Sequence, residues 1–223
     1  PNSINMGTSD FTLSIWVKTD DTGSRQHVFQ QTGSNDNRVI AINSGGSLTS
    51  RLGGNGSDQL SGVTLSTDTW YHIVLVHDNS ANTLKWYVNG TEQNTNTSVN
   101  VPSNTGTFYL GTNSDADDKY FNGQIDEVRI WNDVRTAAEI ADNMEIELAG
   151  DESNLVAYYK MSDGSGTTLT DNSSNSNNGT LTNMVTSGGS SDWVISYAPI
   201  ANMNSSYKTD VEAVWQNTGT DDS

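Results

Sequence analysis

The stretch Tyr120–Asn132 reads YFNGQIDEVRIWN, a run in which apolar residues alternate with charged ones. Such alternation predicts a β-strand, because successive side chains of a strand point to opposite faces of its sheet. The spacing gives the strand two faces: Asp126, Val128 and Ile130 on one, and Ile125, Glu127, Arg129 and Trp131 on the other. Val128 and Ile130 are typical core residues, so we expect Asp126 at the end of a core-facing row. A carboxylate there needs a cation, backbone N–H groups or a metal ion as its partner.

The composition fits one large all-β domain, or one such domain with an appendage. Only 33% of the 223 residues are hydrophobic and 17% are charged, so most of the polarity comes from Asn, Ser, Thr and Gly. The formal net charge of −17 argues against nucleic acid and anionic membrane surfaces as partners. The chain has no cysteine, which excludes disulfides and thiolate sites, and no apolar run long enough for membrane insertion.

Short alternating segments separated by clusters of Asn, Gly, Ser and Asp predict an antiparallel β-sandwich. The first segment is Phe11–Lys18. Four of its apolar residues share one face: Phe11, Leu13, Ile15 and Val17. The segments Trp70–Asp78 and Thr83–Gly90 predict a β-hairpin, with its turn at Asp78–Asn82.

One segment, Arg135–Leu148, has helical spacing instead. Its apolar residues recur at every fourth position: Ile140, Met144 and Leu148. Thr136 and Glu139 stand in capping-box spacing at its start, so we predict a single short helix here.

The chain is expected to divide near its C-terminal end. Residues 1–197 contain the predicted strands, and residues 198–223 form a tail that is either a linker or an extra edge strand. The opening PNSINMG is typical of the middle of a longer precursor, so flanking domains of a parent protein are expected partners.

Five pieces of the chain, in this order, carry a resemblance to a known family: DFTLSIWVK, WYHIVLVHD, LKWYVNG, FNGQIDEVRIWN followed by RTAAEI, and LVAYYKMSDGSGTTLTDNSSNSNNGTL. Together they resemble the laminin G-like, concanavalin A-like jelly-roll domains of bacterial secreted and surface proteins. The resemblance covers roughly residues 5–193 and implies an all-β, two-sheet antiparallel jelly roll with one short surface helix. It also implies an extracellular or cell-surface location.

The same resemblance implies a calcium site. By position in the family motif, Asp126 and Asp171 would supply carboxylates, and three asparagines would supply further oxygens: Asn175, Asn177 and Asn178. All-oxygen ligands of this kind suit calcium. The chain has Ser174 and Ser176 where the family tends to have glycine, and serine is strained if either position needs a positive φ. The alternative is that no metal binds and that Asp126 caps backbone N–H groups or pairs with Arg129 or Lys160.

Two kinds of side chain are candidates for binding a glycan at a loop rim. Three carboxylates stand close together in the turn TNSDADDKYF: Asp115, Asp117 and Asp118. Tyr120 and Trp131 are the aromatic candidates beside them, and Trp193 is also expected to be exposed. The plainer alternative for the carboxylates is an acidic hairpin turn in an acidic protein.

These patterns favour a non-catalytic, calcium-binding recognition module whose target is a glycan. The first alternative is a spacer domain of an adhesin, in which calcium only stiffens a loop. The second is a glycan-active enzyme of the glucanase or lyase type. No stretch of the form E-x-D-x-x-E occurs, and only ten Lys and Arg residues are available for a lyase centre, so we expect no catalysis.

Overall fold

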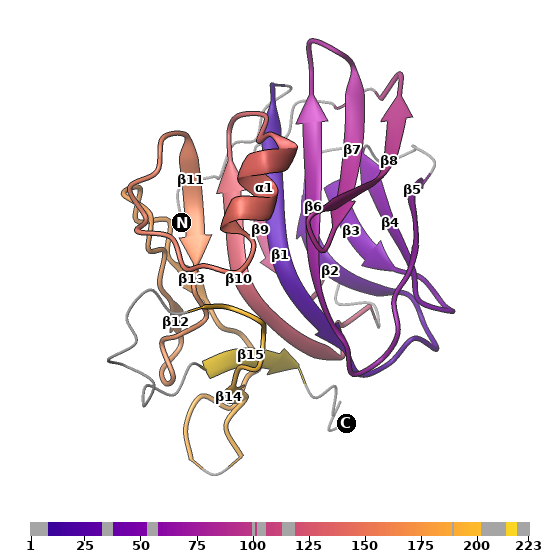
Figure 1. The fold of residues 1–223 in the computed structure, drawn as a ribbon. Helices are drawn as coiled ribbons and strands as arrows, with labels where there is room; N and C mark the ends of the chain where they lie inside the picture. The colour runs from indigo at the N-terminus through magenta and orange to yellow at the C-terminus, as the bar shows by residue number, and fades with distance from the viewer. Residues whose placement is uncertain are drawn as a thin grey trace.

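The computed structural model describes residues 9–32, 38–52, 58–99, 101, 106–112, 119–188, 190–201 and 213–217. Two antiparallel sheets face each other across one core (Figure 1). The larger sheet runs β14 (Trp193–Ile195), β15 (Ala213–Asn217), β10 (Gly123–Trp131), β1 (Phe11–Thr19), β6 (Trp70–Asp78), β7 (Thr83–Val88) and β8 (Thr91–Thr97), with β11 (Leu155–Tyr159) also on β10. The smaller sheet runs β5 (Gln59–Thr64), β4 (Ser47–Leu52), β3 (Arg38–Ile42), β2 (Gln26–Gln31) and β9 (Phe108–Leu110). The predicted two-sheet jelly roll is confirmed.

The core lies between the two sheets and is built from the alternating apolar residues of their strands. The predicted inward face of β1 is buried in full: Phe11, Leu13, Ile15 and Val17 are each at most 1% exposed. The predicted hairpin is also present, since β6 pairs antiparallel with β7 from Ile73↔Val88 to Asp78↔Thr83. A separate two-stranded ladder joins β12 (Thr168–Leu169) to β13 (Gly179–Thr180).

A β-bulge interrupts β10 in the middle of the deciding sequence. Its neighbour β1 pairs Ser14 with Arg129 and then Trp16 with Asp126. One residue of β1 therefore lies opposite two residues of β10, of which Glu127 has a φ of 49°.

The bulge reverses the side-chain alternation within β10. Ile125 joins Val128 and Ile130 in the core between the sheets, and Asp126 points to the opposite side of the sheet. The expectation that Asp126 ends a core-facing row is therefore wrong. The face that carries Asp126, Arg129 and Trp131 is the one on which helix α1 (Ala137–Asn143) lies.

Helix α1 is half as long as the predicted segment. Its capping box is present as expected, with Thr136 as N-cap and Glu139 at the third helical position. The helix nevertheless ends at Asn143, and Leu148 packs against Trp131 beyond it. The last turn has no basic residue, whereas acidic residues follow it at positions 145 and 147, and negative charge at a helix C-terminus opposes the helix dipole.

The segment beyond residue 197 contains β15, which pairs with β10 through Gly123↔Asn217 and with β14 through Trp193↔Trp215. The strand therefore lies between β10 and β14 rather than at the sheet edge. Upstream of it, Ala201 forms a parallel bridge with Ile146. The boundary at residue 197 itself stays a prediction.

Candidate functional site

The charged residues of β10 form a buried clamp that holds the segment after α1. The carboxylate of Glu127 accepts hydrogen bonds from Arg129 Nε at 3.1 Å, Arg129 Nη2 at 2.5 Å and the Tyr158 hydroxyl at 2.7 Å. Arg129 also donates to the carbonyls of Asn143 and Ile146, and the amide of Leu148 donates to the Tyr158 hydroxyl. The ionic side chains of the IDEVRIW sequence therefore fasten the helix and the chain after it to the sheet.

Burial makes this clamp sensitive to any loss of charge. The side chains of Glu127 and Arg129 are only 3% and 2% exposed. Desolvation raises the pKa of Glu127, and the charge and hydrogen bonds of Arg129, with the Tyr158 hydroxyl, oppose that rise. The sequence places Glu127 and Arg129 on one face, and these opposite charges two positions apart on a strand are the signal from which the clamp could have been predicted.

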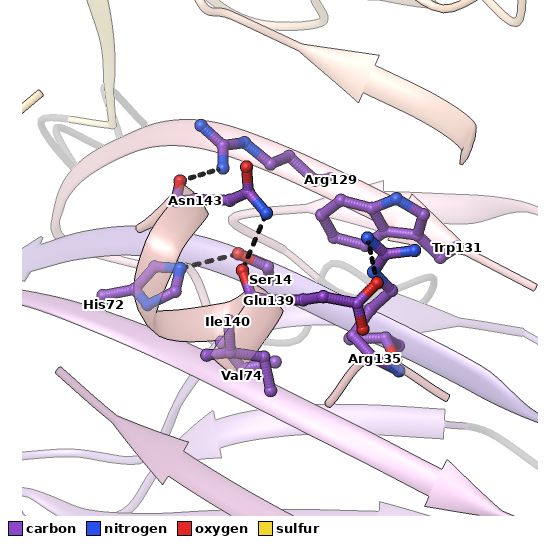
Figure 2. Close-up of a pocket in the computed structure, with 10 residues that line it drawn as sticks. Ser14, His72, Val74, Arg129, Trp131, Arg135, Glu139, Ile140 and Asn143 are labelled. Atoms are coloured by element: carbon purple, nitrogen blue, oxygen red, sulfur yellow. Dashed lines mark hydrogen bonds and ion pairs between the residues drawn. The ribbon is translucent and has the colours of Figure 1, made fainter. Parts of the chain in front are cut away.

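A small pocket lies between α1 and the outer face of strands β1, β6 and β10 (Figure 2). His72 Nε2 lies 2.7 Å from Ser14 Oγ, and His72 Nδ1 has no hydrogen-bond partner among the described residues. Burial, reinforced by the charge of Arg129, lowers the pKa of His72 to about 3, so the imidazole is neutral at physiological pH. The pocket has about 10 Å³ of free space, roughly what one water molecule needs, which is too little for a sugar ring.

The side chain of Asp126 contacts the segment that directly follows β14. Its carboxylate accepts a hydrogen bond from the Ser196 hydroxyl at 2.5 Å and one from the amide of Glu127 at 2.8 Å. The carboxylate is thus held by protein donors from two segments.

Asp171 organises the loop in which four of the predicted calcium ligands stand. Its Oδ1 accepts from the amides of Tyr158 and Ser173, both at 2.9 Å. Its Oδ2 accepts from the Ser173 hydroxyl at 2.9 Å and the Asn177 amide at 2.7 Å. Four donors therefore fill both oxygens of this buried carboxylate.

The asparagines of the loop are engaged in a similar way. Asn175 and Asn177 donate through their side-chain nitrogens to the carbonyl of Val156, while Asn178 Oδ1 accepts from the amide of Asp171. Ser176 has a φ of 56°, so one of the two serines flagged in the sequence does occupy a position that favours glycine.

Carboxylate and amide oxygens are the ligand types that suit calcium, but their arrangement here does not fit an ion. Both oxygens of Asp171 are taken by protein donors, and Asn175 and Asn177 direct nitrogen toward β11. Asp126 and Asp171 bind different segments and share no hydrogen-bond partner in the described part of the chain. Calcium binding would require these contacts to rearrange, so the calcium site stays a prediction.

The predicted glycan-binding residues have three different outcomes. Asp115, Asp117 and Asp118 lie outside the described residues. Tyr120 is 37% exposed and is available at the surface. Trp131 is only 6% exposed, because Leu148, Leu155 and Tyr158 pack around it, so its predicted exposure is wrong. Trp193, 7% exposed, belongs to the core as well.

The comparisons with known proteins agree with this fold. The sequence pattern of the concanavalin A-like lectin/glucanases superfamily matches residues 1–141. No protein with a curated description matches the chain in sequence. No helix of the described residues is long and apolar enough to cross a bilayer.

Several solved structures are similar in fold at low identity. A candidate carbohydrate-binding protein from Bacteroides ovatus is 22% identical with a TM-score of 0.64, and the match covers 78% of this chain and 52% of that one. The chain thus spans about half of that protein. Domain 4 of an extracellular arabinanase from Geobacillus stearothermophilus, solved with arabinotriose, is 24% identical with a TM-score of 0.51 and coverages of 62% and 68%.

A third similar structure is the CBM40 domain of a Ruminococcus gnavus sialidase, bound to α2,3-sialyllactose. It is 16% identical with a TM-score of 0.50, and the match covers 61% of this chain and 83% of that domain. These likenesses describe the fold, and the superfamily pattern covers well over half of the sequence. The chain therefore belongs to the concanavalin A-like lectin/glucanases superfamily.

Proposed function

We propose that this domain is a non-catalytic carbohydrate-binding module of a larger extracellular bacterial protein. One observation carries the proposal: in a fold shared by lectins and glucanases, the three carboxylates that are buried among the described residues accept hydrogen bonds from protein donors and so hold a helix and two loops in place. These residues are Asp126, Glu127 and Asp171. A glycosidase needs two carboxyl groups that flank the scissile bond, and these three are committed to the fold. Two of the similar structures, the arabinanase domain and the CBM40 domain, were solved with bound oligosaccharides, and this supports a glycan as the ligand class.

A glycan array tests the proposal directly. The purified domain is probed against neutral and acidic oligosaccharides, once in calcium chloride and once in EDTA. Selective binding to one glycan class supports a recognition module. Binding to no glycan in either buffer would instead favour the spacer role within an adhesin, and release of shortened products from a bound oligosaccharide would identify an enzyme.

Calcium enters this proposal as a separate question. If calcium binds the loop around Asp171, calorimetric titration with calcium chloride should give a saturable signal that Asp171→Asn abolishes. Thermal stability should then rise with calcium, because an ion that binds only the folded state stabilises it. The absence of both effects would mean that the hydrogen bonds of Asp171 and the loop asparagines hold the loop without an ion.

A further inference from the structure

Two arginines converge on one carboxylate at the outer face of the smaller sheet, on the side away from α1. Leu48 and Leu52 of β4 point into the core, so Arg51 between them points outward. Asp58 directly precedes β5, beside Arg51, and Arg25 directly precedes β2. Three separate segments thus bring these charged groups together.

The contacts fix both guanidinium groups in position. Arg25 Nη1 donates to Asp58 Oδ2 at 2.7 Å and to Asn43 Oδ1 at 2.5 Å. Arg51 donates to Asp58 Oδ1 from Nε at 3.1 Å and forms an ion pair through Nη2 at 3.0 Å. Desolvation opposes ionisation of Asp58, but the hydrogen bond and charge of Arg25, together with Arg51 and Asn43, lower its pKa overall.

The cluster keeps hydrogen-bonding capacity toward solvent. Arg25 Nη2 and Arg51 Nη1 have no acceptor among the described residues, and the two side chains are 26% and 41% exposed. Two guanidinium groups against one carboxylate leave a local excess of positive charge, although the whole chain carries −17. The other three arginines of the chain lie elsewhere: Arg38, Arg129 and Arg135.

An exposed apolar side chain stands next to the charged cluster. Leu60 is 55% exposed and pairs across the ladder with Thr49, which lies two residues from Arg51 on the same strand face. Asp58 and Leu60 are also two residues apart in sequence, so both lie on this face. An oriented cation pair beside an apolar surface suits a sugar ring that carries an acidic group.

We propose that Arg25 and Arg51 form a clamp for the carboxylate of an acidic sugar of the uronate type, with Leu60 against the ring. The inference rests on the proposed function, because it names the ligand class of the same recognition module. A guanidinium presents two parallel N–H donors in one plane, which matches the two oxygens of a carboxylate. The neighbouring Asp58 keeps the donors oriented before the ligand arrives.

Calorimetry with trigalacturonate and with its neutral trimethyl ester tests the clamp. We expect the acid to bind at least about tenfold more tightly than the ester, and Arg51→Gln or Arg25→Gln to weaken acid binding about tenfold. Arg135→Gln, which removes the same charge beside α1, should leave binding unchanged. Unaltered melting temperatures of the variants would show that the fold is intact.

Four results would overturn the clamp. Equal binding of acid and ester, or acid binding that survives both arginine substitutions, would leave a carbohydrate-binding module whose site lies elsewhere. Stronger binding of a sulfated trisaccharide than of trigalacturonate would reject the carboxylate assignment. Binding to none of the neutral and acidic glycans on an array would reject the proposed function together with the clamp.

Discussion

Removing the charge of Glu127 should lower the free energy of unfolding more than most other single substitutions in this domain. Glu127→Gln leaves the shape of the side chain intact but replaces the carboxylate that faces Arg129 and the Tyr158 hydroxyl. Both partners of the ion pair are at most 3% exposed, so the guanidinium would be left as an uncompensated buried charge. Breaking a buried pair in this way costs about 3–5 kcal/mol of the free energy of unfolding. Domains of this size have only about 5–15 kcal/mol in total.

A matched variant separates this effect from a change in net charge. Glu92→Gln also removes one negative charge, but Glu92 pairs with Lys85 at the surface, where their side chains are 42% and 38% exposed. Solvent screens such a pair, and its loss should cost less than about 1 kcal/mol. Tyr158→Phe is a milder probe of the same clamp, because it removes one donor to Glu127 and the acceptor of the Leu148 amide.

Urea unfolding followed by circular dichroism measures all three variants. We expect the loss of stability to be largest for Glu127→Gln, intermediate for Tyr158→Phe at about 1–3 kcal/mol and smallest for Glu92→Gln. Hydrogen exchange in Glu127→Gln should also rise first in α1 and the segment after it, since Arg129 binds their carbonyls. A Glu127→Gln variant as stable as Glu92→Gln would refute the view that the clamp stabilises the fold.

Three further predictions concern the buried histidine, the Asp171 loop and a crowded glycine. Folding lowers the pKa of His72 from its usual value near 6.5 to about 3, so between these pH values the unfolded chain binds a proton that the folded chain does not. The free energy of unfolding should therefore fall by up to about 1.4 kcal/mol for each unit by which the pH is lowered from 6.5 toward 3. His72→Gln should lessen this slope when unfolding is measured as a function of pH. Asp171→Asn places a donor where Oδ2 accepts two hydrogen bonds, so it should cost about 1–3 kcal/mol in urea unfolding even in EDTA; no loss in EDTA would contradict the hydrogen-bonded loop. Gly150→Ala requires a side chain at φ 95° with its Cβ 2.0 Å from the Asn172 carbonyl oxygen, and should lower the melting temperature more than Gly164→Ala, which has φ 68° but open space.

Much of the fold could be predicted from the sequence, because local patterns determine it. The alternation in Phe11–Lys18, the turn at Asp78–Asn82 and the capping box at Thr136 each depend on neighbouring residues alone. All three are confirmed. The predicted helix is too long, because acidic residues follow its last turn and Arg129 of the adjacent sheet binds the carbonyl of Asn143 at its end.

The site could be predicted less well, because it depends on contacts between distant segments. One extra residue in β10 turns the side chain of Asp126 to the other face of the sheet, and no local pattern in IDEVRIW predicts that bulge. The burial of Trp131 likewise depends on Leu148 and Leu155, which reach it only after the chain has folded back. Burial by remote segments is not encoded in the spacing of a single strand.

The glycan array in calcium and in EDTA tests the central claim most directly, with the wild-type domain and Arg135→Gln beside Arg51→Gln. The account predicts binding that concentrates on oligosaccharides with carboxylate groups, that Arg135→Gln retains and that Arg51→Gln loses. An array on which the wild-type domain binds no glycan in either buffer would contradict the assignment of this domain as a carbohydrate-binding module.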